Sequence, residues 1–313
     1  MTDSYSKPKG NLVAFLAHSP LRGSRLRADR RKDGPRRIEL SVVSHRLSRR
    51  ELLQLAAVAA AGAGAVANAQ SSRPPDRSLA SVKALVFDTF GTVVDWRSSV
   101  AAEVGALAKR KGVTLDAEKF ADAWRAGYGP SMNRVRSGEL PWTKLDALHR
   151  MTLEKILVDF NMTGLTDAEK DTLNHAWHRL RPWPDAVGGL TRLKKKFIIA
   201  PLSNGNISLM TDLAKHSGLP WDVILGAELA RHYKPDREVY QSAADILDLK
   251  PADVMMVAAH LGDLRAAKGV GLKTAFVTRP LEYGPNGKPD LKPDASVDVT
   301  AKDFNDLATK LGA

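Results

Sequence analysis

The sequence predicts an α/β fold in which a parallel, doubly wound sheet forms the core and a bundle of helices is inserted as a cap. Residues 82–87 are predicted to form the first strand, because the apolar residues 84–87 lead directly into Asp88, as expected of a strand buried on both faces. Four stretches with helical spacing follow without an intervening strand. From residue 197 strands alternate with helices to the end of the chain, which indicates a parallel sheet.

The core is expected to comprise residues 82–95 and 184–313, and the cap residues 96–183. Cap helices are predicted at residues 98–111, 116–136, 144–160 and 166–181, because glycines or a Gly/Pro pair separate these stretches. After the first strand, the core strands are predicted at residues 197–202, 222–225, 254–259 and 273–277. Core helices are predicted to begin at Asn206, Asp236 and Asp263, and a closing helix to span residues 301–311.

The charge of the chain is unevenly distributed. Of the net charge of +12, residues 1–69 carry +8, from 13 Lys and Arg against 5 Asp and Glu. The rest of the chain has 34 basic and 30 acidic residues, and no basic run is interleaved with aromatic residues. We therefore expect an ordinary solvated surface and no nucleic-acid partner.

The chain has no cysteine. Disulfides, iron–sulfur clusters, thiolate zinc sites and thiol nucleophiles are therefore excluded. Any nucleophilic chemistry has to come from another side chain.

The first 69 residues read as an export leader. Residues 48–53 are Ser-Arg-Arg-Glu-Leu-Leu, an Ala/Gly-rich apolar stretch covers residues 55–67, and Ala-Asn-Ala follows at residues 67–69. Together these resemble a twin-arginine signal with a small-residue cleavage site, which implies the twin-arginine export machinery as a partner, cleavage near Ala69 and a periplasmic location. Residues 70–81, rich in Ser, Pro and Arg, are predicted to be a linker.

Two alternatives remain for this leader. The apolar stretch is too short for a good membrane span, but it could serve as an uncleaved anchoring helix. Residues 1–40 show no apolar periodicity, so the signal has either an unusually long basic leader or a later translation start, near Val42 or Val43.

Polar groups follow several predicted strands at the point where each strand ends. Because the carboxyl ends of parallel strands meet at one edge of a sheet, these groups are expected to lie together. Asp88 has the placement of a nucleophile, although an Asp that caps a turn is the alternative. Ser203 and Asn204 offer a hydroxyl and an amide beside a helix start, which suits a substrate carboxylate, or simple helix capping.

These motifs resemble those of the haloacid dehalogenase superfamily across residues 82–313. The resemblance includes the run that ends in Asp88, the Lys-Pro-Asp at residues 234–236 and Asp263. In the phosphatases of this superfamily the residue two positions after the nucleophile is a second Asp, which protonates the leaving alcohol. Here it is Phe90, so the chain looks like the 2-haloacid dehalogenases (type II), whose leaving halide needs no proton.

The resemblance implies a role for each site residue. Asp88, Lys234 and Asp263 would be catalytic, with Lys234 keeping Asp88 ionised. The residues implied to bind substrate or halide are Thr92, Arg125, Ser203, Asn204 and Tyr240. Without the resemblance, Lys234 and Arg125 read as surface residues and Tyr240 as a packing residue. No metal is expected, because Phe90 depletes the acidic set; magnesium is expected only if the chain is a phosphatase.

The loop before Asp263 departs from well-characterised relatives, several of which have Ser-Ser-Asn where this chain has Ala-Ala-His at residues 258–260. His260 is our candidate, together with Asp263, to orient or deprotonate the hydrolytic water, since a neutral imidazole is a fitting base. A structural His that bonds the loop backbone is the alternative.

The function that follows is hydrolytic dehalogenation of short L-2-haloalkanoic acids to D-2-hydroxy acids through an aspartyl ester. A magnesium-dependent phosphatase is one alternative, against which Phe90 argues. An exported binding protein with a degenerate site is another, which Ala258 and His260 allow. The resemblance also implies a homodimer.

Overall fold

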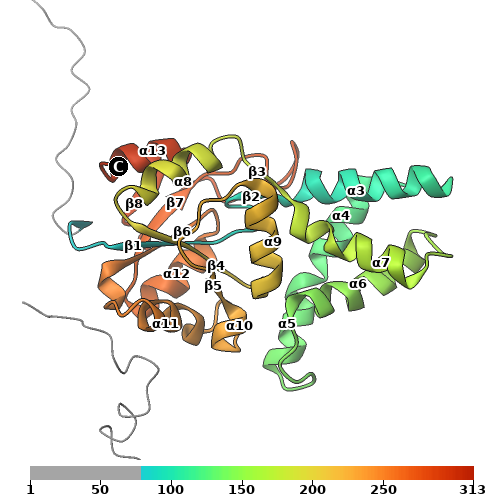
Figure 1. The fold of residues 1–313 in the computed structure, drawn as a ribbon, viewed down its shortest axis with the longest axis horizontal. Helices are drawn as coiled ribbons and strands as arrows, with labels where there is room; N and C mark the ends of the chain where they lie inside the picture. The colour runs from blue at the N-terminus through green and yellow to red at the C-terminus, as the bar shows by residue number, and fades with distance from the viewer. Residues whose placement is uncertain (1–78) are drawn as a thin grey trace, which may run out of the picture. The chain divides into compact units, whose positions relative to one another are not determined.

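The core of the molecule is a six-stranded parallel sheet (Figure 1). The computed structural model describes residues 79–313, so the predicted leader and cleavage site lie outside the described residues. The strand order is β5-β4-β1-β6-β7-β8, and every neighbouring pair is parallel. The predicted α/β class is confirmed. The strands are β1 Ala84–Phe87, β4 Ile198–Ser203, β5 Leu225–Gly226, β6 Val254–Ala258, β7 Lys273–Val277 and β8 Val299–Ala301.

Strand β1 lies at the centre of the sheet and is buried on both faces. Leu85 and Phe87 belong to one hydrophobic cluster, and Ala84 and Val86 belong to another on the opposite face. This explains why β1 reads as an unbroken apolar run. Phe87 is in register with residues near the ends of β4 and β6, so the loops after these three strands meet at one edge.

Helices cover both faces of the sheet (Figure 1). The side chains of α8 (Ala186–Lys194), α9 (Ile207–Ser217) and α13 (Phe304–Lys310) join the cluster of Leu85, whereas α11 (Arg237–Ile246) and α12 (Leu261–Val270) join the cluster of Val86. The short helix α10 (Ala227–Ala230) follows β5 directly.

The segment between β2 (Val94–Asp95) and β3 (Arg181–Pro182) contains only helices. These two short strands pair antiparallel, so the chain enters and leaves the helical segment at one place. Figure 1 shows the helices beyond one end of the sheet. They are α3 Trp96–Lys111, α4 Ala117–Ala126, α5 Tyr128–Arg136, α6 Leu145–Asp159, α7 Asp167–Asn174 and the 3-10 turn η2 His175–Arg179.

The single helix predicted for residues 116–136 is wrong, because the structure has two helices separated at Gly127. A Cβ at Gly127 would lie 2.4 Å from Cγ2 of Thr152, so this position has to be glycine for α6 to pack there. The helix predicted for residues 166–181 likewise stops at Asn174 and continues as η2.

Three further elements differ from the prediction in the core. The strand predicted at residues 222–225 is only Leu225–Gly226. Asp222 still contacts β4: its N–H donates to the Ile199 carbonyl and its carboxylate accepts the Ile199 N–H, each at 2.9 Å. The start of the predicted closing helix is strand β8, and α13 begins at Phe304 after the N-cap Asp303. Helix α8 was not predicted; its adjacent glycines weaken the helical signal, yet Gly189 allows close contact with Phe304.

Within residues 79–313, no helix combines the length and the hydrophobicity that crossing a membrane would require.

Candidate active site

Asp88 lies directly after β1, at the edge of the sheet where the loops meet. Its side chain is almost fully buried, and both carboxylate oxygens accept hydrogen bonds. Oδ1 accepts from Lys234 Nζ at 2.9 Å, and Oδ2 accepts from Thr92 Oγ1 at 2.6 Å. His260 Nδ1 also lies 3.0 Å from Oδ2. The carboxylate is thus fixed in position by three neighbours, as an in-line nucleophile requires.

Lys234 bridges Asp88 to a second carboxylate. Its ammonium group lies 2.5 Å from Asp263 Oδ2, and Tyr240 donates its hydroxyl to Asp263 Oδ1 at 2.5 Å. Lys234 and both carboxylates are each about nine-tenths buried. Three of the predicted catalytic residues therefore lie together, and Tyr240 supports them through Asp263.

Charge pairing decides the protonation of this cluster. Burial alone would raise the pKa of Asp88, but Lys234, His260 and Thr92 together hold it well below its usual range. Burial would lower the pKa of Lys234, yet the two carboxylates raise it above the normal lysine value. Burial raises the pKa of the Asp263 carboxyl, and Lys234 counters only part of that rise. Asp88 is therefore ionised at every pH at which the protein is expected to work.

His260 has a second partner that the sequence did not reveal. Its Nε2 lies 2.9 Å from Oε1 and 3.0 Å from Oε2 of Glu282, a carboxylate that is 1% exposed. Burial would lower the pKa of His260, but hydrogen bonds to Asp88 and Glu282 raise it to about 10. The imidazole is therefore a cation while Asp88 is ionised, and its partners are Asp88 and Glu282, not the expected Asp263.

A cavity of 310 Å³ opens beside Asp88. Its core side is formed by residues of the cluster just described, with Asn204, and its other side by Arg125, Tyr128 and Met132 from α4 and α5. The Arg125 guanidinium lies 4.1 Å from the centre of the Tyr128 ring, and its Nη1 is buried without a hydrogen-bond partner. Arg125 and Asp88 thus line the same cavity, and the contact of Arg125 with halide or substrate stays a prediction.

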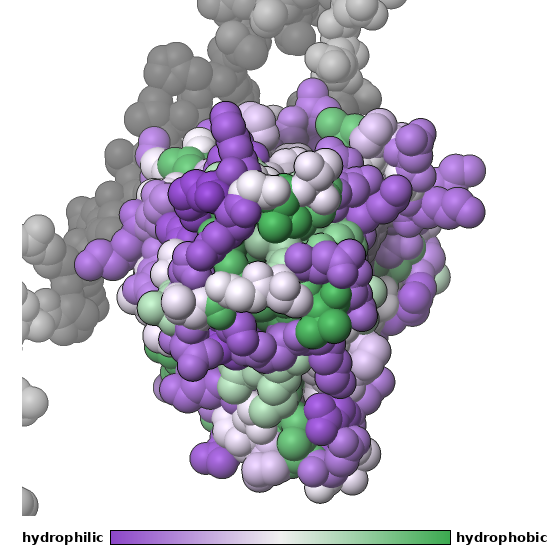
Figure 2. Space-filling view, turned by 90° about the vertical axis from the view of Figure 1, so that its right-hand side faces the viewer, coloured by the Kyte–Doolittle hydropathy of each residue, from purple (hydrophilic) through white to green (hydrophobic). Residues whose placement is uncertain are grey.

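The outer surface near the helical segment differs from this interior. Figure 2 shows that hydrophilic residues dominate this end of the molecule and border small apolar patches. We therefore assign the functional site to the cavity and not to this surface.

The remaining predicted residues support the site to different degrees. Thr92 Oγ1 also accepts the Ala259 N–H at 2.9 Å, so Thr92 joins Asp88 to the loop after β6. Asn204 lines the cavity, and its Oδ1 accepts the Lys234 N–H at 2.7 Å. Ser203 is fully buried and its Oγ accepts from the Gly205 N–H at 3.1 Å. Ser203 therefore shapes the loop and does not line the cavity.

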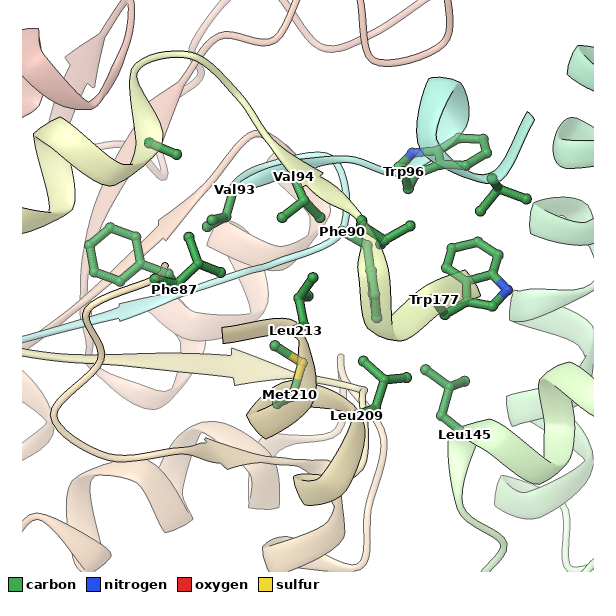
Figure 3. Packing of buried hydrophobic residues seen from close by; sticks show 14 of the residues in the cluster. Phe87, Phe90, Val93, Val94, Trp96, Leu145, Trp177, Leu209, Met210 and Leu213 are labelled. Carbon is green, nitrogen blue, oxygen red and sulfur yellow. The ribbon is translucent and has the colours of Figure 1, made fainter. Parts of the chain in front are cut away.

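Phe90 is part of a hydrophobic contact between the sheet and the helical segment. Figure 3 shows its ring beside Trp177, and the ring centroids are 5.7 Å apart in an edge-to-face arrangement. Tyr128 makes a similar contact at 6.3 Å. Phe90 is 2% exposed, so an acidic side chain at this position would be buried among aromatic rings.

The set of acidic side chains near Asp88 is small for a magnesium site. Within the described part of the chain, no three His, Asp or Glu side chains are arranged to hold a metal ion. The space between the Asp88 and Asp263 carboxylates is filled by the Lys234 ammonium, and Phe90 supplies no further oxygen ligand. Magnesium prefers six oxygen ligands, several of them waters.

Comparison with known proteins assigns the family. Residues 82–271 match the haloacid dehalogenase-like hydrolases. The chain belongs to this family. Within the haloacid dehalogenase-like hydrolases it groups with the L-2-haloacid dehalogenases, as the predicted resemblance indicated.

Several relatives support this assignment. The (S)-2-haloacid dehalogenase 4A of Burkholderia cepacia is 32% identical over 244 residues, which cover 70% of this chain and 97% of the relative. The (S)-2-haloacid dehalogenase 1 of Pseudomonas sp. (strain CBS-3) is 31% identical over 219 residues, which cover 64% of this chain and 88% of the relative. The crystal structure of the defluorinating L-2-haloacid dehalogenase Rha0230 has a TM-score of 0.73 and 49% identity, covering 76% of this chain and all of that one.

Proposed function

We propose that the protein hydrolyses short L-2-haloalkanoic acids to D-2-hydroxy acids. One observation carries the proposal: the hydrogen-bonded carboxylate of Asp88 and the guanidinium of Arg125, whose Nη1 has no hydrogen-bond partner, line the same 310 Å³ cavity. A small anion with a carbon–halogen bond would place its reacting carbon next to Asp88 and its negative groups near Arg125. The names of the relatives agree with this substrate class.

The first step is displacement at the α-carbon. An Asp88 oxygen forms a bond to that carbon, and the halide leaves with the electrons of the carbon–halogen bond. The attack inverts the configuration, so an L substrate gives a D product. Arg125 stabilises the departing halide or the substrate carboxylate, and Asn204 contributes polar contact from the core side. Water then cleaves the ester and restores Asp88.

We further propose that the reaction needs no metal. Lys234 already pairs with both carboxylates, and a halide leaves as a stable anion without the proton that the second Asp of phosphatases supplies. Phe90, packed against Trp177, makes the phosphatase alternative less suited to this site.

The test is halide release by residues 70–313 from separate L- and D-2-chloropropionate in EDTA, with 2-fluoropropionate as a second halogen. Chloride from the L form alone, together with D-lactate, is the expected result. The Asp88→Asn variant should release at least about 10⁴-fold less halide, because the nucleophile is lost. Release only of phosphate from phosphate esters with magnesium would support the phosphatase instead, and no release of either would support the binding protein.

Export through the twin-arginine route is also part of the proposal, on the strength of residues 48–69. Cell fractionation of the full chain should find the processed protein in the periplasm. Replacement of Arg49 and Arg50 by Lys should leave the precursor inside the cell. An unchanged distribution would contradict the export signal.

The homodimer implied by the resemblance is the last part of the proposal. Light scattering coupled to size-exclusion chromatography should give twice the mass of residues 70–313. A mass of one chain would contradict it.

A further inference from the structure

Glu282 is a buried carboxylate that the reaction as described does not use. It lies in the segment between β7 and β8 and contacts His260 Nε2 with both oxygens. The indole N–H of Trp96 donates to Oε1 at 3.3 Å. A Cβ at Gly91, where φ is +89°, would lie 2.1 Å from the same oxygen. The turn after Asp88 thus has a glycine where Glu282 approaches the backbone.

The segment that carries Glu282 is anchored to the turn that follows Asp88. Arg279 makes a paired ionic contact with Asp185 at 2.8 and 2.9 Å, and its Nε donates to the Thr92 carbonyl at 2.8 Å. Thr92 in turn donates to Asp88. These contacts hold Glu282 in place relative to Asp88, and His260 bridges the two carboxylates.

We propose that Glu282 is a positioning residue for the second step, and that formation of the ester on Asp88 converts His260 into the base that deprotonates the hydrolytic water. The inference rests on the proposed dehalogenation. It assigns a role to each ring nitrogen of the imidazole: Nε2 stays hydrogen-bonded to Glu282, and Nδ1 lies next to the Asp88 ester.

The charges that face His260 explain the conversion. In the free enzyme its neighbours are the carboxylates of Asp88 and Glu282, and beyond Asp88 lie Lys234 and Asp263. Alkylation removes the negative charge of Asp88, whereas the Lys234–Asp263 pair remains. His260 then has one carboxylate partner where it had two, so its pKa falls and the Nδ1 proton passes to solvent.

The protons balance over the cycle. The proton lost by His260 to solvent accompanies the halide. Water attacks the ester carbonyl carbon and gives one proton to Nδ1, which passes it to the departing alkoxide oxygen as the bond between that oxygen and the carbonyl carbon breaks. The proton left on the new Asp88 carboxyl returns to Nδ1. The enzyme ends with Asp88 ionised and His260 protonated, as it began.

The experiment compares Glu282→Gln with the wild type in rapid-quench single-turnover assays with L-2-chloropropionate. The variant should release about one chloride per site at the wild-type rate and then turn over about 10²-fold more slowly, the lower range for general-base catalysis. Intact-protein mass spectrometry should detect the ester on Asp88. The acid limb of the ester-hydrolysis rate should move to lower pH, since an amide stabilises the imidazolium less than a carboxylate does.

Two matched variants separate positioning from folding. Glu282→Asp keeps the charge and should retain more ester hydrolysis than Glu282→Gln. Trp96→Phe removes one donor to Glu282 and should slow the same step by a few-fold, which provides the test if Glu282→Gln does not fold.

Other results would overturn the inference. The positioning role of Glu282 would be excluded if Glu282→Gln slowed the chloride burst and turnover equally and accumulated no ester. It would also be excluded if the acid limb of the pH profile of ester hydrolysis did not move. Failure of the wild type itself to release halide would contradict the proposed function, and this outcome is distinct from the others.

Discussion

The two sides of the cavity are built differently. On the core side every charged group has a partner: Asp88 accepts from three side chains, and Lys234 is held between two carboxylates. On the side formed by the cap helices, Arg125 Nη1 lacks a hydrogen-bond partner, and so do both ring nitrogens of His149, a buried residue of α6 that lies behind the cavity wall beside Tyr128. The core side is thus organised before substrate arrives, whereas the cap side keeps a donor available for an anion.

The largest test of this comparison is Lys234→Met on the core side. It leaves two buried carboxylates facing each other, so we expect the unfolding free energy to fall by about 3 kcal/mol. Halide release should fall by about 10²–10³-fold, because Asp88 loses the cation that keeps it ionised. Chemical denaturation and initial rates measure both effects. Lys234→Arg is the control that keeps the charge, and an intact stability in Lys234→Met would mean that the network is not pre-organised.

On the cap side, Arg125→Met should separate activity from stability. We expect kcat/KM to fall by about 10²-fold, since a cationic donor facing the substrate is lost. The unfolding free energy should change by less than about 1 kcal/mol, because Nη1 has no partner in the free protein. Arg125→Lys, which keeps a charge with fewer donors, should give an intermediate rate. A stability loss as large as that of Lys234→Met would remove the contrast between the two sides.

His149→Phe tests the other unpartnered group. The imidazole stacks on Trp177 with ring centroids 4.4 Å apart, so a phenyl ring is a close substitute, and removal of two buried unpartnered nitrogens should stabilise the protein by about 1 kcal/mol. Burial lowers the pKa of His149 to about 3. The native state therefore resists protonation, and the wild type loses stability as pH falls from about 6.5 toward 3.

The variant should lose less stability over that range than the wild type does. Thermal melts at pH 7 and pH 4.5 measure the difference, and the exposed His216→Ala is the control. An equal loss of stability in His149→Phe and in the wild type would mean that protonation of His149 does not cause the loss.

The smallest effect is expected where the two regions meet. His178 lies between Asp146 of α6 and Asp212 of α9, with contacts of 3.1 and 2.9 Å. Burial would lower the pKa of His178, but these carboxylates raise it. Its stabilisation is therefore present below about pH 6.5 and is lost as pH rises through the higher folded pKa. Asp212→Asn should cost about 0.5 kcal/mol at pH 5.5 and less at pH 9, because Asp212 is largely exposed.

Thermal melts of the wild type and of Asp212→Asn at pH 5.5 and pH 9 test this expectation. An identical cost at both would show that the contact with Asp212 does not depend on the charge of His178.

The sequence predicted those features that depend on local pattern. The apolar run before Asp88 predicted β1 because a central parallel strand has no polar face, and the Lys-Pro-Asp motif placed Lys234 beside the site. Features that depend on distant contacts were missed. The break at Gly127 reflects the approach of Thr152, and Asp222, predicted to lie in β5, instead contacts Ile199 outside any strand pairing.

Glu282 illustrates the same limit within the site. It lies in an Arg-Pro-Leu-Glu stretch outside any strand or helix, so neither periodicity nor a strand end marked it. Its proximity to His260 depends on the anchoring of Arg279 by Asp185, which no local pattern reports. The partner of His260 could therefore be found only in three dimensions.

The position of Glu282 in the chain also bears on how relatives are sorted. The family match ends at residue 271, so the carboxylate lies beyond the region by which membership is recognised. Chains that share every motif up to Asp263 can thus differ in whether a Glu reaches the loop after β6. The combination of His at position 260, Glu at position 282 and Gly at position 91 would mark a distinct group inside the family. A chimera that exchanges only residues 278–298 would transfer or remove the Glu.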